Sequence, residues 1–408
     1  MPDVNGMVMA VLAALLGALA ISLPLTWMMV RAGHRLGALD SAGSRGHAKE
    51  LRRVPNIGGV GIFHAVVLPM LAGLIGVWVI DGETWSRWLP ALEPHLPRIR
   101  ETTPTALAMV SCMTVLHVIG LVDDRRGLSP WIKLAVQFAA AAVMTLFFEV
   151  RLLTVLDGYV PGASIAVTLL WIVAMTNALN FLDNMDGLAG GVAAIASFMF
   201  MLATILNEQW FIAGTLALMV GGLCGFLVFN FPPARIFMGD GGSLVIGFLL
   251  SILTARTTFY DPAQADFALG TAWYGVFMPV VVQAIPLYDF CTVTIIRLRQ
   301  GRSPFVGDQQ HFSHRLVQRG LSKRGAVIII WGFTAITGAG GIALGSLAPW
   351  QAVLVGAQTI LILIVLAMLE HASRRVPGRI AESDGDQAGR FTTETQSAQR
   401  RSKGEQGS

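Results

Sequence analysis

Polar side chains that can do phosphate chemistry stand where long apolar stretches of this sequence end or begin. Asp123 and Asp124 follow one such stretch, Asn180 lies near the end of another, and Asp240 precedes a third. A carboxylate at a bilayer centre costs about 2.5–3.5 kcal/mol even on insertion scales, so acidic groups beside apolar spans are candidates for function. These residues predict an enzyme site at one face of a membrane protein.

The adjacent carboxylates of Asp123 and Asp124 form the first candidate cluster. Neighbouring residues on a helix point about 100° apart, so one carboxylate can face a metal or a phosphate while the other faces an incoming nucleophile. The alternative is a solvated helix end in which both acids pair with Arg125 and Arg126.

A row of amides forms the second cluster. Asn177, Asn180 and Asn184 recur at intervals of three and four residues, which places them on one stripe of a helix, with Asp183 beside them. Hydrogen bonds between helices, worth about 0.6 kcal/mol each, are the alternative role. That role would not need Asp183 and the acid that follows it, Asp186, before a glycine-rich turn through which backbone can approach a ligand.

The segment Phe237–Ser243 forms the third cluster. Its glycines at the start of an apolar stretch expose N–H groups and the positive end of a helix dipole to anions. Asp240 adds a hard oxygen ligand of the kind that Mg²⁺ uses together with phosphate oxygens. A simple N-cap aspartate is the alternative.

Two basic segments complete the set. His311, His314 and Arg315 are clustered donors suited to a pyrophosphate, and a lipid headgroup patch is the alternative. A weaker cluster, whose charges suit any anionic membrane surface, comprises Asp40, Arg45, His47 and Arg53.

The elements that position these clusters are predicted to be transmembrane helices. Hydrophobic residues make up 54% of the 408 positions and charged residues 13%, which excludes a soluble globule and predicts an all-α polytopic membrane protein. Eleven stretches are long enough to cross a bilayer. They are residues 7–30, 57–80, 104–122, 131–150, 164–183, 187–206, 210–230, 241–256, 268–290, 325–347 and 350–370.

Basic residues predict the orientation of these helices. Of the 29 Lys and Arg residues, 24 lie in five segments: 31–56, 122–133, 231–240, 291–325 and 371–408. The positive-inside rule places these segments in the cytoplasm and the N-terminus outside. The basic residues are therefore orientation signals, and nucleic acid is not a predicted partner.

Residues 1–375 form the predicted transmembrane catalytic domain, and residues 376–408 form a disordered cytoplasmic tail. All five clusters fall on the cytoplasmic side. The loops that carry them are residues 31–56, 122–133, 183–187, 231–242 and 291–325.

In this order, the motifs resemble those of the polyprenyl-phosphate N-acetylhexosamine-1-phosphate transferases. They are Asp123-Asp124, Asn-x-x-Asn-Phe-x-Asp-x-x-Asp-Gly-Leu from Asn177, Phe-Met-Gly-Asp-x-Gly-Ser from Phe237, and the histidine loop. The resemblance runs from about Asp40 to Leu321. It implies a bacterial inner-membrane enzyme that transfers a sugar-1-phosphate from a UDP-N-acetylhexosamine to polyprenyl phosphate and releases UMP.

The resemblance also implies roles for individual residues. Asn180 and Asp240 would hold Mg²⁺, or Mn²⁺, on the nucleotide diphosphate. Asp123 and Asp124 would position or deprotonate the lipid phosphate. The substrate-binding residues would be Asn177, Asp183, Asp186, Phe237, His311, His314 and Arg315, with Phe237 stacked on uracil and Asp186 reading the uracil edge.

Two positions depart from the family pattern. The middle histidine of the usual His-x-His-His-Arg motif is Ser313, and the usual glycine after Asp183 is Asn184. We expect Ser313→His to keep activity and to steepen the pH dependence of UDP-sugar binding, because histidine gains charge below about pH 6.5.

N-acetylglucosamine is the favoured sugar, and a phospho-N-acetylmuramoyl-pentapeptide donor is the alternative within the family. A homodimer is left open. A secondary transporter and a non-catalytic binding protein for the lipid carrier are the alternatives from other classes. A transporter would place its acidic groups near mid-span, whereas these clusters stand at span ends.

Overall fold

A computed structural model describes residues 4–36, 54–257, 260–261, 266–267, 273–303, 310–342 and 344–371 of the chain. The chain divides into two compact units, Met1–Val365 and Leu366–Ser408. The architecture below is that of the first unit. The predicted loop residues Asp40, Arg45, His47 and Arg53 and the predicted tail 376–408 lie outside the described residues.

The described residues are almost entirely helical, which confirms the all-α class. The α-helices are α1 (Val4–Leu36), α2 (Gly59–Val79), α3 (Gly82–Trp88), α4 (Leu96–Arg126), α5 (Pro130–Ala142), α6 (Ala163–Leu182), α7 (Leu188–Leu206), α8 (Trp210–Asn230), α9 (Asp240–Thr257), α10 (Met278–Val282), α11 (Ala284–Arg299), α12 (Phe312–Gln318), α13 (Lys323–Ile342) and α14 (Pro349–His371). Short 3-10 helices are η1 (Pro90–His95), η3 (Thr154–Gly158), η4 (Trp273–Phe277) and η5 (Leu344–Ser346), and η2 (Val143–Phe147) is a π-helical turn. The strands β1 (Tyr260–Asp261) and β2 (Asp266–Phe267) pair antiparallel.

Nine helices of the described residues are long and apolar enough to cross a membrane, and a tenth is added if one bent pair is counted. The bent pair, Gly275–Val282 and Ala284–Arg299, turns by 63° where the sequence predicts one span over 268–290. The predicted span 241–256 is α9, which is not among the nine because Asp240, Arg256 and several Gly and Ser residues lower its apolar content. Within the described residues, nine or ten of the eleven predicted spans thus have the length and apolar content to cross a membrane.

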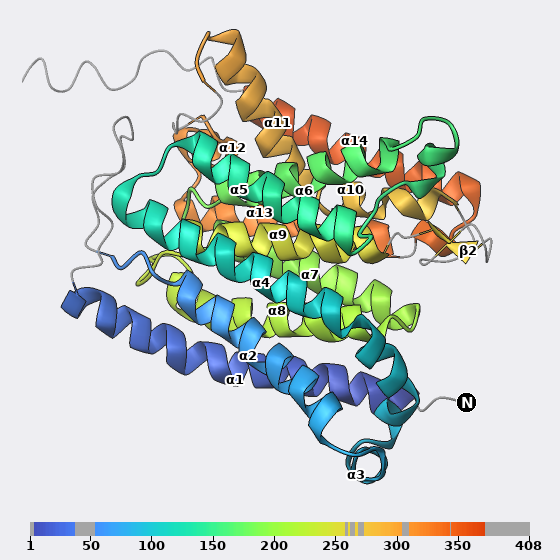
Figure 1. The fold of residues 1–408 in the computed structure, drawn as a ribbon. Helices are drawn as coiled ribbons and strands as arrows, with labels where there is room; N and C mark the ends of the chain where they lie inside the picture. Colours follow the sequence, from blue (N-terminus) through green and yellow to red (C-terminus); the bar gives the residue numbers. More distant parts are fainter. Residues whose placement is uncertain are drawn as a thin grey trace, which may run out of the picture. The chain divides into compact units, whose positions relative to one another are not determined.

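Helix α9 lies at the centre of the first unit (Figure 1). Every residue from Gly241 to Ala255 is buried, and α9 packs against α4 and α6 most extensively, and also against α2, α7 and α8. A side chain on Gly120 of α4 would place its Cβ 2.5 Å from the backbone carbon of Asp240, so only glycine lets the two helices approach there. This crossing brings the end of α4 to the start of α9.

Candidate active site

The first feature of the site is a lysine held between two carboxylates. The Nζ of Lys133, in the first turns of α5, lies 2.7 Å from Oδ2 of Asp123 and 2.8 Å from Oδ2 of Asp240. The side chains of Asp123, Lys133 and Asp240 are 13, 22 and 23% exposed, so this bridge is shielded from solvent but not sealed. Three helices thus meet at one charged cluster that a polar ligand can reach.

Asp124 points away from its neighbour, as the helical spacing predicts. Its carboxylate accepts hydrogen bonds from the backbone N–H groups of Asp240 (3.0 Å) and Gly241 (3.2 Å), and from Nδ2 of Asn56 (3.1 Å). A carboxylate at free N–H groups of a helix start is favoured by the helix dipole. The two adjacent acids therefore differ: Asp123 faces Lys133, whereas Asp124 fixes the start of α9.

Two of the three amides predicted to share a helical stripe lie on α6, whereas Asn184 lies in the turn that follows its end at Leu182. Asn180 donates to Oδ1 of Asp240 and to Oγ of Ser243, both at 2.9 Å. Asn177 donates at 2.5 Å to Oε1 of Gln137 on α5, which matches the alternative role of a hydrogen bond between helices. Asn180 and Asp240 thus lie in contact, while their role in metal binding and substrate binding by Asn177 stay predictions.

The loop between α6 and α7 is hydrogen-bonded to the segment from the end of α8 to the start of α9. Oδ2 of Asp186 accepts from the backbone N–H of Ala234 at 3.0 Å, and Oδ1 of Asn230 accepts from Gly187 N–H at 2.9 Å. Phe237 is half-buried in the second loop, and Asp183 caps the end of α6. These contacts place both predicted nucleotide-binding segments together.

His311 lies behind the site surface rather than on it. Its imidazole is 5% exposed, with Nδ1 2.7 Å from Oδ2 of Asp289 and Nε2 3.4 Å from Nη2 of Arg297. Asp289 on α11 is fully buried and also accepts from the backbone N–H of Phe312 at 3.0 Å. This arrangement fixes the start of α12, and a direct contact of His311 with a diphosphate stays a prediction.

The two departures from the family pattern contact each other. Oγ of Ser313 donates to Oδ1 of Asn184 at 2.7 Å, and Nδ2 of Asn184 donates to the carbonyl of Phe181 at 2.8 Å. Ser313 is fully buried. His314 and Arg315, on the following residues of α12, are partly exposed. The end of α6 therefore joins the acidic cluster, through Asn180, to the histidine segment.

This contact revises the expectation for Ser313→His. A histidine in a fully buried position overpacks the site, which costs about 1–3 kcal/mol, so we now expect the single variant to lose activity. Asn184→Gly should restore activity in the double variant, because it removes the side chain that fills the same space. Thermal unfolding and turnover of both single variants and the double variant measure this coupling. Equal losses in Ser313→His and in the double variant would contradict it.

Three residues of the site were missed in the sequence: Lys133, Asp289 and Arg297. Each is a single charged residue at or near an apolar stretch, and such a residue is by itself a signal for function or for a buried partner. Their partners lie 10 to 107 positions away in the chain, which no local spacing reveals.

The donor set suits Mg²⁺. No group of three His, Cys, Asp or Glu side chains in the described part of the chain is arranged as a closed metal site. Mg²⁺ needs no such cage, since it usually binds through one or two carboxylates together with waters and substrate phosphates. Asp240 with the amide of Asn180 supplies such a partial set. The ammonium group of Lys133 lies between the carboxylates of Asp240 and Asp123, which shows that this position favours a cation.

Comparison with known proteins identifies the family of this chain. The model of Glycosyl transferase family 4 matches residues 106–258, which include Asp123, Lys133, Asn180 and Asp240. The decaprenyl-phosphate N-acetylglucosaminephosphotransferase of Mycobacterium tuberculosis is 32% identical over 296 residues, 68% of this chain and 72% of that protein. The chain belongs to the polyprenyl-phosphate N-acetylhexosamine-1-phosphate transferases.

Other members of this transferase family align over different lengths. The probable undecaprenyl-phosphate N-acetylglucosaminyl 1-phosphate transferase of Bacillus subtilis is 28% identical over 367 residues, 88% of this chain and 90% of that protein. The undecaprenyl-phosphate alpha-N-acetylglucosaminyl 1-phosphate transferase of Escherichia coli K12 is 29% identical over 239 residues, 56% of this chain and 62% of that protein. The family resemblance inferred from the motifs is thereby confirmed.

Proposed function

We propose that this protein transfers N-acetylglucosamine-1-phosphate from UDP-N-acetylglucosamine to polyprenyl phosphate, which starts a lipid-linked glycan of the cell envelope. An oxygen of the lipid phosphate attacks the phosphorus that carries the sugar. A new P–O bond forms there, the bond from that phosphorus to the bridging oxygen of the diphosphate breaks, and UMP leaves. The relatives named above support the reaction and the sugar, since their names specify N-acetylglucosamine and a polyprenyl phosphate.

One observation carries the proposal: Asp123, Lys133, Asn180 and Asp240 converge from four helices. Joining two phosphate groups brings negative charges together, so the site has to hold them in line and supply positive charge. Lys133 supplies a fixed cation, and Asp123 is the carboxylate best placed to accept a proton from, or to orient, the lipid phosphate. Asp124 positions the start of α9.

Mg²⁺, or Mn²⁺, is proposed as the metal, held by Asp240 and Asn180. When bound, the ion would neutralise charge on the diphosphate and favour departure of UMP. Asp186, Phe237, His314 and Arg315 are proposed to bind the nucleotide and its diphosphate, with Phe237 stacked on the base and Arg315 a permanent cation.

Incubation of the purified protein with labelled UDP-N-acetylglucosamine, polyprenyl phosphate and Mg²⁺ tests the reaction. The proposal predicts a labelled lipid and one UMP for each sugar transferred. Uptake of an unmodified solute into vesicles, without product, would favour a transporter. Binding of the lipid phosphate without turnover would favour a carrier-binding protein.

We further propose that the site faces the cytoplasm of a bacterial inner membrane, because the positive-inside rule predicts that segments rich in Lys and Arg lie inside. A cysteine introduced at Ser408 should be protected from a membrane-impermeant maleimide in intact cells and should react after permeabilisation. A cysteine at Glu83, an exposed position at the start of α3, should react in intact cells. The reversed labelling pattern would show that the protein has the opposite orientation in the membrane.

Binding of the UDP-sugar should depend on pH through His314. Burial, with the nearby His311, lowers the pKa of the His314 imidazole, so this ring is neutral near pH 7 in the free protein. An anionic diphosphate favours the charged ring, so binding takes up a proton and affinity rises as pH falls from 8 toward 6, by at most about tenfold per pH unit. Calorimetric titration measures this slope. His314→Gln should flatten it, whereas His34→Gln, at an exposed position on α1, should not.

A further inference from the structure

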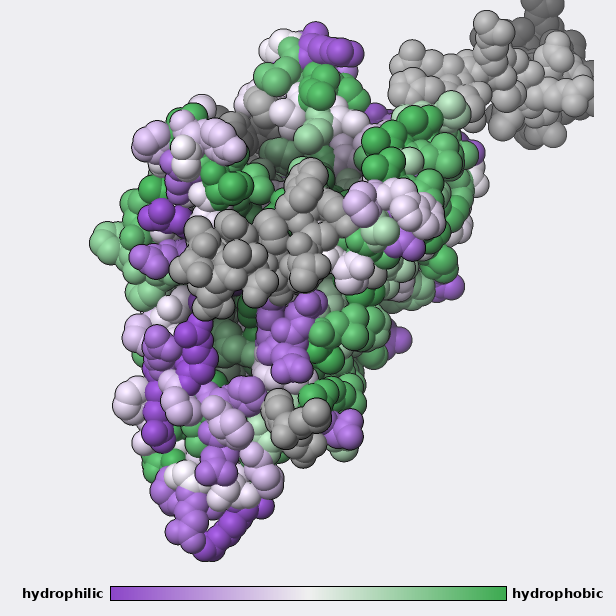
Figure 2. Space-filling view, turned by 90° about the vertical axis from the view of Figure 1, so that its right-hand side faces the viewer, coloured by the Kyte–Doolittle hydropathy of each residue, from purple (hydrophilic) through white to green (hydrophobic). Residues whose placement is uncertain are grey.

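A cavity lined by both apolar and charged side chains lies at the opposite end of the helices from the acidic cluster. Its volume is about 620 Å³, and it is lined at the start of α4 by Arg98 and at the end of α9 by Arg256. At 1.5 Å per residue, Arg98 stands roughly 38 Å along α4 from Asp123. Figure 2 looks onto this end and shows hydrophilic side chains on both sides of a hollow. The cavity is therefore separate from the transferase site.

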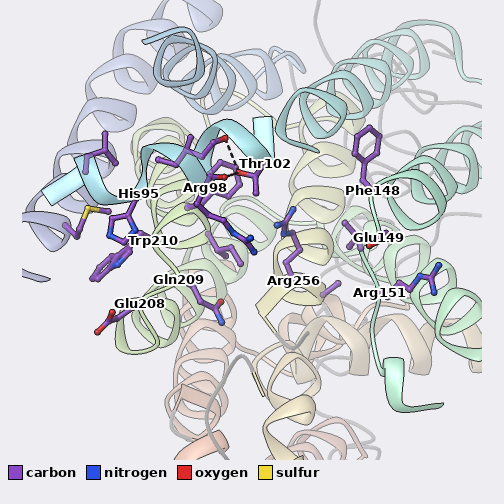
Figure 3. Close-up of a pocket in the computed structure, with 17 residues that line it drawn as sticks. His95, Arg98, Thr102, Phe148, Glu149, Arg151, Glu208, Gln209, Trp210 and Arg256 are labelled. Atoms are coloured by element: carbon purple, nitrogen blue, oxygen red, sulfur yellow. Dashed lines mark hydrogen bonds between the residues drawn. The ribbon is translucent and has the colours of Figure 1, made fainter. Parts of the chain in front are cut away.

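Positive charge in this cavity is incompletely neutralised. Arg98 and Arg256 extend toward each other (Figure 3) and are close enough to repel. Arg256 makes no hydrogen bond or ion pair with any residue that the structure describes. Arg98 pairs with Glu101 at 3.1 Å, but both of those side chains are mostly exposed, so that pair contributes little. A partly buried, unpaired guanidinium beside a second one favours an anion, above all a phosphate.

Carboxylate and amide groups line the same cavity. Glu149 lines the cavity from the connection between α5 and α6, and Gln209 lines it from the connection between α7 and α8, whereas the carboxylate of the neighbouring Glu208 points away from the two arginines (Figure 3). Glu149 and Glu208 both have left-handed backbone conformations, with φ of 53° and 54°. Carboxylates accept hydrogen bonds from hydroxyl groups, and an amide both donates and accepts. The lining thus combines cations for a phosphate with acceptors for hydroxyls.

We propose that this cavity binds a phosphate ester that carries free hydroxyl groups, with its phosphate on Arg98 and Arg256 and its hydroxyls on Glu149 and Gln209. The glycerol phosphate headgroup of an anionic phospholipid has this chemistry, and so does soluble glycerol phosphate. The position at the end of membrane-spanning helices makes a lipid headgroup directly accessible.

Thermal unfolding of the full-length purified protein in detergent tests this site, because a ligand that binds the folded state raises the unfolding temperature. The additives are phosphatidylglycerol, phosphatidylcholine and soluble glycerol phosphate. We expect phosphatidylglycerol to stabilise the protein by several degrees more than phosphatidylcholine. Stabilisation by glycerol phosphate to the same extent would identify the free ester as the ligand, and its failure to stabilise would identify the lipid.

Matched arginine variants assign the effect to the cavity. Arg256→Gln should raise the half-saturating concentration of the stabilising ligand at least fivefold, and Arg256→Lys should retain most of the affinity. Arg87→Gln removes an exposed arginine near the same end and should change nothing. If Arg256→Gln fails to fold, Arg98→Gln provides the same test. Equal loss in the Arg87 and Arg256 variants, or no stabilisation by either phosphate ester, would overturn the proposal.

Discussion

Asp240→Asn is expected to lower turnover at least about 100-fold, or roughly 2.7 kcal/mol of transition-state stabilisation. The substitution removes a negative charge that contacts Lys133 and accepts from Asn180, and that is proposed to hold Mg²⁺. The remaining activity should need a higher Mg²⁺ concentration. Steady-state kinetics at increasing Mg²⁺ measure both effects, and chelation by excess EDTA should abolish turnover of the unmodified protein.

Asp157→Asn is the matched control for Asp240→Asn. Asp157 accepts hydrogen bonds from the backbone N–H (2.9 Å) and Oγ of Ser164 and stands at the opposite end of α6 from Asn180. Its substitution should leave turnover and the Mg²⁺ requirement unchanged. Full activity of the unmodified protein in EDTA would contradict the proposed role of the metal. An Asp240→Asn protein that no longer folds would instead support a structural, helix-capping role.

Lys133→Met is expected to reduce turnover by a comparable factor, about 100-fold or more, because it removes a preorganised cation from the site of phosphoryl transfer. Its effect on the affinity for Mg²⁺ should be opposite to that of Asp240→Asn. Without the ammonium between Asp123 and Asp240, the two carboxylates attract a cation more strongly, so the apparent affinity for Mg²⁺ should rise. Lys133→Arg should keep part of the activity. A Lys133→Met protein with a weaker Mg²⁺ affinity would show that the lysine helps to hold the metal site together.

The helical spacing predicted much of the acidic cluster. Adjacent residues on a helix diverge, and Asp123 and Asp124 do face different partners. The three-and-four spacing predicted Asn177, Asn180 and Asn184 on one helical stripe, but α6 ends at Leu182 and Asn184 lies in the turn after it. The spacing also could not say that the three residues would bond to α5, α9 and α12 in turn. Such pairings depend on how helices pack, and the distances in sequence between the partners are 40 to 129 residues.

The histidine segment was the least predictable part. Two imidazoles and an arginine in a basic loop favour an exposed anion site, yet His311 is buried between Asp289 and Arg297. Asp289 was embedded in an apolar stretch that reads as a simple span, and its burial with a partner could be known only from the fold. The bend between α10 and α11 was likewise absent from the apolar pattern, which does not distinguish a broken helix from a straight one.

The fate of the sugar-proximal phosphate tests the proposed reaction most directly. UDP-N-acetylglucosamine labelled with ³²P in its β-phosphate is incubated with the purified protein, polyprenyl phosphate and Mg²⁺. Transfer of a sugar-1-phosphate places the label in the lipid product and leaves the released UMP unlabelled. Label recovered in UDP, with an unlabelled sugar on the lipid, would mean attack at the sugar carbon and would contradict the reaction proposed for this site.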